Sequence, residues 1–509
     1  MEYTTETPLY IRVSEKMQTK GEINTDLILP DSYEDVRRIL HATASICPER
    51  SELSSGKLLS EGKVLIDLLF EDDTGKIGSV SFNRDYKITC NAEKNENENR
   101  IICLPAADSL SVKLLNPRKI GARLTVDTCA RLWEESSPAL EMPEAFTPSD
   151  RLTVEKKEEY AESLCVHSVF DSARQISEDI ELGRSDMPIE KILLADLSVG
   201  VDKTVRTGDN LDIKGSVRLC TLYQDGEGEL WRKDSEIPFS QTVDVSGIPD
   251  SEGCEYIARV YVDQKSVQPG ENAFGELKVM ELDFSCVAYV VQLCPCKVKL
   301  TKDAFSTEYC TENRMSRVRS AFLVPAVADS QSRRVQAEWD GDKKAVCMFS
   351  ECNIRSEDPS SLTVNVKFTL LLEGSGKNHS TVTVSDSFPL QTDGMSECFA
   401  WAQIAEEKMI SDNGKAEITY TVSSEAKGWR LTDTSYVSGI ELCENTDSTE
   451  MRAMNIYYPQ NGETLWDVAK KYRISENALM CCNGMNEESG MRRVLLIPKR
   501  RRSVISKII

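Results

Sequence analysis

Few residues of this chain have the chemistry of a catalytic site. There are only three histidines, His41, His167 and His379. A Ser-His-Asp or Cys-His site needs a histidine beside its nucleophile, and the sequence around these three shows no such partners. His41 also aligns with Leu194 in the internal repeat described below, so the repeated unit does not keep it. We therefore predict no catalytic residue and expect that the protein is not an enzyme.

Two short motifs resemble ligand-binding loops but lack the required residues. Gly374-Ser375-Gly376-Lys377 resembles the end of a phosphate-binding loop. That loop needs a glycine five positions before its second glycine and a Ser or Thr after the lysine, where this chain has Leu371 and Asn378. We predict a hairpin turn there. The acidic run Glu71-Asp72-Asp73 has too few ligands at suitable spacing for a calcium loop.

The 17 cysteines are scattered through apparent strands, and their number is odd. We predict no disulfide framework, because single buried thiols behave as small hydrophobic side chains and suit a reducing compartment. Cys294-Pro295-Cys296 and Cys481-Cys482 are close pairs, but neither has a second pair at the spacing of a structural zinc site. We therefore predict no metal and no cofactor.

The charge and hydropathy of the chain restrict its partners. A formal net charge of -22 repels nucleic acid and anionic membranes, so we expect no nucleic acid partner. The basic run 499–502, followed by Lys507, is either a solvated tail or an arm for an acidic partner or a membrane surface. The first ten residues lack the pattern of a signal peptide. Apolar runs such as 287–291 are far shorter than the roughly 20 residues of a membrane span, so we expect a cytosolic chain without a transmembrane segment.

An internal repeat organises most of the chain. Residues 27–46 (LILPDSYEDVRRILHATASI) and 180–199 (IELGRSDMPIEKILLADLSV) share a pattern at an offset of 153 (192 − 39), which continues until Tyr86 aligns with Phe239. A weaker third copy follows at an offset of 151, which aligns Leu211, Val217 and Leu219 with Leu362, Phe368 and Leu370. Sequence repeats of this kind predict repeated structural units.

The repeat is predicted to be rich in β-strands. Apolar residues alternate with polar ones over 211–221 and 363–370, which indicates half-buried strands. The sequence Asp225-Gly226-Glu227-Gly228 is a turn signal. The apolar spacing at 32–40 and 188–194 favours a short helix in each of the first two copies, capped in the first by Asp31 or Ser32. We predict a mainly β fold of tandem β-sandwich-like units with short helices.

The C-terminal residues 454–499 follow a different pattern. A short strand at 456–459 precedes a helix capped by Thr464, and Ser475 caps a second helix that runs to Cys482. Asn483-Gly484 is suited to ending that helix, and 494–498 returns as a strand. This βααβ order in about 45 residues resembles a LysM domain closely.

The resemblance to LysM implies a binding site for N-acetylglucosamine polymers such as peptidoglycan. The family's groove would lie between two loops, formed here by Gly462, Glu463, Thr464 and Leu465 on one side and by Asn483, Gly484 and Met485 on the other. Trp466, Leu479 and Ile497 are expected to be core residues. The chain departs from the family at Cys481-Cys482 and at 488–491, which read Glu-Ser-Gly-Met where a Pro-Gly turn is usual.

The repeats resemble SPOCS domains, which occur in spore coat proteins of Firmicutes. The resemblance rests on Pro188-x-x-x-Ile192-Leu193, with Ile189 between, and on the Gly-x-Val-x-Leu strand at 215–219. SPOCS repeats followed by LysM resemble clostridial spore coat morphogenetic proteins. This architecture implies a scaffold in coat assembly that acts in the mother-cell cytosol at the forespore surface. It also implies that the LysM domain binds the coat morphogenetic ATPase.

An alternative remains open, in which LysM binds peptidoglycan in the cell envelope and the repeats are spacers. A metal-dependent enzyme would require stoichiometric metal, for which we find no ligand set. We expect SPOCS-like domains at 1–149, 150–300 and 301–445, a linker at 446–453, the LysM domain at 454–499 and a basic tail at 500–509. Exposed edge strands would allow self-association.

Overall fold

The computed structural model describes residues 10–17, 20–54, 56–91, 99–128, 130–136, 140–141, 153–171, 173–341, 343–358, 361–376, 378–392, 394–412, 414–443, 454–486 and 492–498. Strands dominate this part of the chain, and its two α-helices both lie near the C-terminus. The predicted mainly β fold is confirmed. The basic tail, the expected linker at 446–453 and the sequence at 488–491 lie outside the described residues.

Each of the three repeats is a sandwich of antiparallel sheets around its own apolar core, with three sheets in the first repeat and two in each of the others. Three consecutive strands form one sheet. On the opposite side of each sandwich, the C-terminal strand of the repeat pairs with its N-terminal strand. The N-terminal and C-terminal ends of a repeat therefore meet in one sheet. Each repeat is therefore a complete β-sandwich formed by its own strands.

The strands of the first repeat form the sheets β3-β4-β5, β2-β8-β7 and β1-β9-β6. Their bounds are β1 (Tyr10–Met17), β2 (Lys20–Ile28), β3 (Val36–Ser54), β4 (Lys57–Asp72), β5 (Ile77–Asn91), β6 (Asn99–Cys103), β7 (Ala106–Asn116), β8 (Lys119–Asp127) and β9 (Ala130–Ser136).

In the second repeat, β12-β13-β14 packs against a sheet in which β16 pairs with β10, β11 and β15. The bounds are β10 (Val154–Phe170), β11 (Arg174–Glu181), β12 (Lys191–Thr207), β13 (Asn210–Gln224), β14 (Leu230–Asp244), β15 (Glu255–Gly270) and β16 (Val279–Ser306). Because β16 runs to Ser306, this repeat extends beyond residue 300, where we expected it to end.

The third repeat has the same arrangement, with β19-β20-β21 against β23 and its partners β17, β18 and β22. The bounds are β17 (Thr311–Leu323), β18 (Val327–Glu338), β19 (Lys344–Asp358), β20 (Ser361–Glu373), β21 (His379–Leu390), β22 (Glu397–Asp412) and β23 (Lys415–Leu442). The Gly374 region is the turn between β20 and β21, where the backbone N–H of Gly374 donates to the carbonyl of Asn378.

The predicted short helices at 32–40 and 188–194 are wrong. The chain there enters strands β3 and β12. The pairing of β3 with β4 shifts register between Val36 and Arg38 and again between Ile39 and His41, and β12 shifts between Ile192 and Leu194. Each extra residue of a bulge displaces the apolar alternation by one position. The resulting spacing of three and four residues imitates the period of a helix.

The three repeats pack against one another through shared apolar clusters. One cluster joins Leu40 and Leu69 of the first repeat, Leu193 and Leu222 of the second, and Leu371 of the third. A second cluster also draws on all three repeats, with Ile102, Leu164, Val291, Phe399 and Trp429 among its members. The three repeats therefore form one packed body and are not independent domains joined by linkers.

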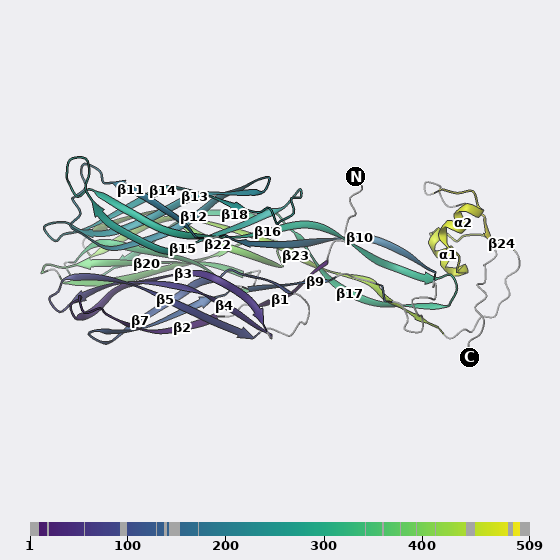
Figure 1. The fold of residues 1–509 in the computed structure, drawn as a ribbon, viewed down its shortest axis with the longest axis horizontal. Helices are drawn as coiled ribbons and strands as arrows, with labels where there is room; N and C mark the ends of the chain where they lie inside the picture. Colours follow the sequence, from purple (N-terminus) through teal and green to yellow (C-terminus); the bar gives the residue numbers. More distant parts are fainter. Residues whose placement is uncertain are drawn as a thin grey trace.

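Four strands continue beyond this body as a narrow arm (Figure 1). We define the arm as residues 154–163 of β10, 296–306 of β16, 311–319 of β17 and 432–442 of β23. The β10–β16 and β17–β23 ladders hold small apolar clusters between them, one around Val298, Leu300 and Val318 and another around Ala304, Val437 and Ile440. The C-terminal module (residues 454–498) lies at the far end of the arm (Figure 1).

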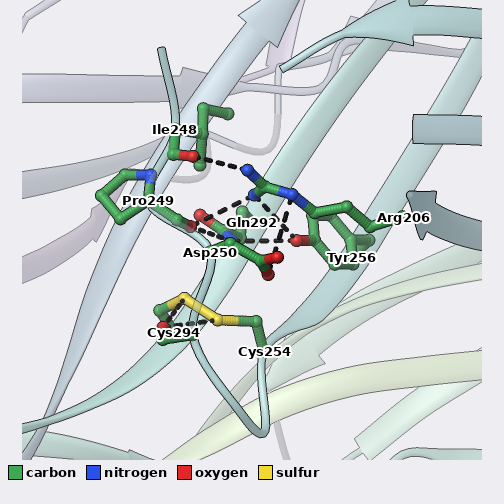
Figure 2. Close-up of a disulfide and its surroundings, with 9 residues drawn as sticks. Arg206, Ile248, Pro249, Asp250, Cys254, Tyr256, Gln292 and Cys294 are labelled. Atoms are coloured by element: carbon green, nitrogen blue, oxygen red, sulfur yellow. Dashed lines mark hydrogen bonds and ion pairs between the residues drawn. A yellow bond between two sulfur atoms is a disulfide. The ribbon is translucent and has the colours of Figure 1, made fainter. Parts of the chain in front are cut away.

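We predicted no disulfide framework and single buried thiols, and this is wrong for one pair of cysteines. Cys254 and Cys294 are joined by a disulfide, with their Cα atoms 4.3 Å apart (Figure 2). Glu255 of β15 lies opposite Leu293 of β16, so the next residue outward on each strand faces its counterpart. The two cysteines are 40 residues apart in the sequence, and their spacing alone could not reveal the pairing.

Candidate functional site

The C-terminal module has the predicted βααβ order. It consists of β24 (Met454–Tyr457), α1 (Leu465–Tyr472), α2 (Glu476–Cys482) and β25 (Leu495–Pro498), with β24 and β25 paired antiparallel. Thr464 caps α1 and Ser475 caps α2. Trp466, Leu479 and Ile497, the expected core residues, are 5%, 0% and 1% exposed.

One side of the expected groove is the loop before α1. Gly462 and Thr464 are exposed and Leu465 is half-buried. The Glu463 carboxylate accepts hydrogen bonds from the Tyr457 hydroxyl (2.8 and 2.9 Å) and from the backbone N–H of Gln460 (2.9 Å). Glu463 therefore stabilises its own loop, and the accessible surface on this side comes from its neighbours.

The other side is the loop after α2. The Asn483 side chain is buried and bridges α2 to β25: its amide donates to the carbonyls of Leu479 and Leu496 (both 2.8 Å), and its oxygen accepts from the N–H of Leu496 (2.7 Å). Met485 is buried in the module's core, and the half-buried Leu465 from the opposite side packs against the same apolar cluster. Gly484 alone is exposed here. The open part of the groove is thus limited to Gly462, Thr464 and Gly484.

The capping of α1 gives a first testable prediction. Thr464 Oγ1 accepts from the N–H of Asp467 (3.3 Å), and the Asp467 carboxylate accepts from the N–H (2.8 Å) and hydroxyl (2.6 Å) of Thr464. Hydrogen bonds from Thr464 lower the pKa of Asp467. Thr464→Ala should cost about 1 kcal/mol of module stability, measured as a shift in its urea midpoint. Thr464→Ser should keep most of the stability that the capping hydrogen bonds provide. Equal losses of stability in both variants would show that the Thr464 hydroxyl does not stabilise α1.

Trp466 connects the module to the arm. Its indole packs edge-on against Phe305 of β16, with ring centroids 5.0 Å apart, and its Nε1–H donates to Asp303 (2.7 Å). Phe305 is 3% exposed and belongs to the same apolar cluster as the core of the module. The core of this small domain is therefore completed by a side chain from the second repeat, which sequence reasoning did not reveal.

Asp303 is the polar centre of this junction. Besides Trp466, it accepts from Lys470 of α1 (2.5 Å) and Asn313 of β17 (2.6 Å). Burial alone would raise the pKa of Asp303, but the hydrogen bonds from Lys470 and Trp466 outweigh it and lower that pKa. A carboxylate with these partners is ionised at neutral pH and fixes the orientation of the module on the arm.

The outer face of the module's sheet is unusually apolar. Alternate residues of β25, Leu495 and Ile497, face the core, whereas the residues between and beside them face solvent. Ile456 and Leu496 are directly paired, and they are 63% and 37% exposed. Tyr458 (69%) and Val494 (41%) extend the same exposed surface. We call Ile456, Tyr458, Val494 and Leu496 the apolar strand face. Contiguous exposed apolar side chains of this kind mark interaction surfaces.

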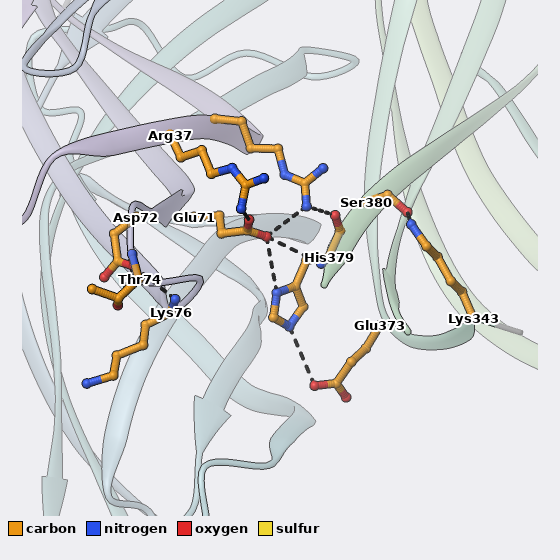
Figure 3. Close-up of polar contacts among 10 residues, drawn as sticks. Arg37, Glu71, Asp72, Thr74, Lys76, Lys343, Glu373, His379 and Ser380 are labelled. Atoms are coloured by element: carbon orange, nitrogen blue, oxygen red, sulfur yellow. Dashed lines mark hydrogen bonds and ion pairs between the residues drawn. The ribbon is translucent and has the colours of Figure 1, made fainter. Parts of the chain in front are cut away.

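A second polar cluster, drawn in Figure 3, lies where the first and third repeats meet. Glu71, at the end of β4, is 2% exposed in its side chain and accepts from Arg38 (2.7 Å) and from the backbone N–H of His379 (3.3 Å). Burial alone would raise the pKa of Glu71, but these hydrogen bonds lower it. The His379 ring lies between Glu71 (3.4 Å) and Glu373 (3.5 Å). The cluster thus holds the two repeats together.

This cluster does not have the geometry of a nucleophilic site. The neighbouring Ser380 hydroxyl accepts from Lys343 (2.7 Å) and is not paired with the imidazole of His379. His41 stacks on Phe349 with ring centroids 4.1 Å apart and is 6% exposed. Within the described residues, no three His, Cys, Asp or Glu side chains are grouped as ligands for a metal ion. No helix in that part of the chain has the length and apolar character to cross a bilayer.

Comparisons with known proteins identify two domains. Residues 188–269, within the second repeat, match the family described as SipL, SPOCS domain. Residues 460–489 match the LysM domain family. The chain therefore contains a SPOCS domain and a LysM domain. The resemblances stated from the sequence are thereby confirmed. No curated protein and no solved structure gives a match. Both matched families are binding domains, so the chain has the domains of a sporulation-related or envelope-binding protein.

Proposed function

We propose that the protein is a non-enzymatic adaptor in bacterial spore coat assembly, in the mother-cell cytosol at the forespore surface. Its LysM domain would bind the coat morphogenetic ATPase, and its SPOCS repeats would present further surfaces to the coat. The observation that carries this proposal is the position of the LysM domain. It lies at the end of the arm, with the apolar strand face directed away from its own core.

The chemistry of the exposed surface favours a protein partner. Buried aromatic and aliphatic anchors provide most of the binding energy in protein interfaces, and Ile456, Tyr458 and Leu496 are of these types. A glycan polymer requires polar groups that are free to bind its hydroxyls and amides. In the groove, Glu463 and Asn483 already use their polar atoms within the domain.

Peptidoglycan binding is the second candidate, because the LysM match itself supports it. Backbone groups at the exposed Gly462, Thr464 and Gly484 would then contact the N-acetyl groups of the sugar. The two candidates use different surfaces of the same domain, and point variants distinguish them.

The test measures binding of the purified ATPase and of purified cell-wall fragments to the full chain. We expect the ATPase to bind the full chain, and to lose affinity at least about tenfold with Ile456→Lys, since a buried charge without a partner costs more than about 1.4 kcal/mol. A chain ending at Glu450 should not bind. The matched control is Lys471→Ala, an exposed position on α1.

Two results would overturn the proposal. One is ATPase binding that survives removal of the LysM domain. The other is a full chain that ignores the ATPase but pellets with cell-wall fragments, with Gly484→Trp abolishing the pelleting. The second result would replace the adaptor by the envelope-binding candidate.

A further inference from the structure

The disulfide between Cys254 and Cys294 has two further cysteines beside it. Cys294 lies on β16, and the residue directly opposite it on β10 is Cys165. Directly opposed residues of antiparallel strands project from the same face, with Cβ atoms about 4.5–5.5 Å apart. Cys296 is two residues further along β16, and a period of two keeps it on that face as well. Four sulfur atoms therefore gather on one face of the strands around β16.

The two additional thiols form a pair of their own. Cys165 and Cys296 share a side-chain hydrogen bond, which together with burial raises the pKa of the Cys296 thiol well above its usual range. Both residues are half-buried. The site thus holds one disulfide next to one dithiol, which is the composition that thiol–disulfide exchange requires.

The loop that carries Cys254 supplies a hydrogen-bond donor. The Ser251 hydroxyl lies 3.1 Å from the sulfur of Cys254 and 3.1 Å from that of Cys294. A disulfide sulfur can only accept, so Ser251 donates to it. Cys254 is half-buried while Cys294 is 4% exposed. Ser251 can stabilise a thiolate on either sulfur, but solvent reaches Cys254 more readily, so the sulfur of Cys254 is the better leaving group.

The loop is also held by contacts that do not depend on the disulfide. The carbonyl of Pro249 accepts from the Gln292 amide (3.0 Å) and from Arg206 (3.2 Å), and Arg206 donates to the carbonyl of Ile248 (2.8 Å) (Figure 2). The Tyr256 hydroxyl accepts from Gln292 (3.0 Å). The loop would thus keep its place if the disulfide moved elsewhere.

We propose that these four cysteines form an internal thiol–disulfide exchange site, which moves the disulfide from Cys254–Cys294 to Cys165–Cys296. In the first step the Cys165 thiolate attacks the sulfur of Cys294. A Cys165–Cys294 bond forms, the Cys254–Cys294 bond breaks, and Cys254 leaves as a thiolate that takes up a proton. In the second step the Cys296 thiolate attacks the sulfur of Cys165, and Cys294 leaves and is protonated. One disulfide and two thiols are present before and after, so no oxidant is consumed.

The exchange changes what the disulfide fastens. At the start it ties the loop before β15 to β16. At the end it links β10 to β16 at the base of the arm, one residue from Leu164, which belongs to the cluster shared by the three repeats. The disulfide therefore crosslinks either the loop before β15 or the base of the arm, but not both. In cytosolic proteins, a disulfide is usually transient or redox-sensing.

The experiment follows the thiols of the folded full chain by alkylation and peptide mass spectrometry. Cys254 and Cys165 lie on different tryptic peptides, so their labelling is read separately. After incubation at pH 9 without added thiol, label on Cys254 should rise and label on Cys165 should fall to the same extent. The rate should increase up to about tenfold per pH unit, because the thiolate is the nucleophile.

Variants test the order of the steps. Cys165→Ser should abolish the gain of label on Cys254, and Ser251→Ala should slow it several-fold. Cys481→Ser, an exposed position in the LysM domain, is the matched control and should behave as the parent. Circular dichroism at each pH checks that every variant is folded.

Three results would overturn the proposal. Cys254 could stay unlabelled at every pH at which the chain is folded. It could gain label equally in Cys165→Ser, which would indicate simple cleavage of the disulfide. Or Cys254 and Cys294 could both be labelled from the start, which would show that no disulfide is present to be exchanged.

Discussion

Replacing Trp466 by alanine should unfold the LysM domain and release it from the arm. The substitution removes a buried indole from the core, its ring contact with Phe305 and its hydrogen bond to Asp303. Truncation of a buried tryptophan costs about 3–5 kcal/mol, and a domain of this size rarely has more stability than that. Hydrogen exchange of the full chain should therefore show loss of protection over α1 and α2, with the three β repeats unchanged.

A matched variant separates the core from the junction. Phe305→Ala leaves every residue of the LysM domain in place and removes its apolar contact on the arm. We expect α1 and α2 to stay protected against hydrogen exchange, at a lower level than in the parent protein, because the domain keeps its own core and loses only the contact with the arm. If Trp466→Ala shows the same protection as the parent protein, the assignment of Trp466 to the core is wrong.

Replacing His41 by leucine should remove part of the loss of folding stability that the three repeats suffer at acid pH. Burial, followed by the charge of Lys367, lowers the pKa of His41 from 6.5 to about 3. Between these values the unfolded chain binds a proton at this position and the folded chain does not. The stability that depends on neutral His41 is therefore complete above pH 6.5 and is lost as the pH falls toward 3. The slope is about 1.4 kcal/mol per pH unit.

The measurement compares urea midpoints at pH 7.5 and 5.5, which avoids the sequence pI near 4.8. At pH 7.5, His41→Leu should differ little from the parent, because leucine occupies the equivalent place in the second repeat (Leu194) and the imidazole Nε2 has no hydrogen-bond partner to lose. At pH 5.5 the variant should be more stable by about 1.4 kcal/mol. His167→Leu, at a half-buried position, is the control. An equal pH dependence in His41→Leu and the parent would refute the prediction.

Most of the fold could be predicted from the sequence because strand alternation and the repeat are local or periodic signals. The alternation over 363–370 became β20, with Val364, Val366, Phe368 and Leu370 all buried. The offset of the third copy was less accurate. In the second repeat Gln224 pairs with Lys191, next to a bulge, and in the third repeat Glu373 pairs with Lys344 at the equivalent place. The offset between these two strands is therefore 149 (373 − 224) and not 151. A difference of two preserves the buried face, and burial patterns alone do not detect it.

The features that escaped sequence reasoning depend on contacts between distant parts of the chain. The bulges in β3 and β12 arise from pairing with β4 and β13, and no local pattern distinguishes them from a helical turn. Trp466 was predicted to be a core residue, but the sequence gives no sign that Phe305 and Asp303 complete its surroundings. The facing of Cys254 and Cys294 likewise follows from the register of β15 on β16. The capping of α1 and α2 was predictable because it involves neighbours within three residues.

The long ladders of the arm have a mechanical consequence. β23, the last strand before the LysM domain in the chain, pairs with β17 from Leu442 opposite Thr311 to Trp429 opposite Leu323, interrupted by one register shift. Hydrogen bonds between antiparallel strands lie perpendicular to the strand direction. A load applied to the LysM domain along the arm therefore shears many of these bonds at once and does not open them one after another. We therefore expect the arm to resist tension. A partner bound to the LysM domain would stay attached to the body of three repeats under a pulling force, without separation of the strands from one end.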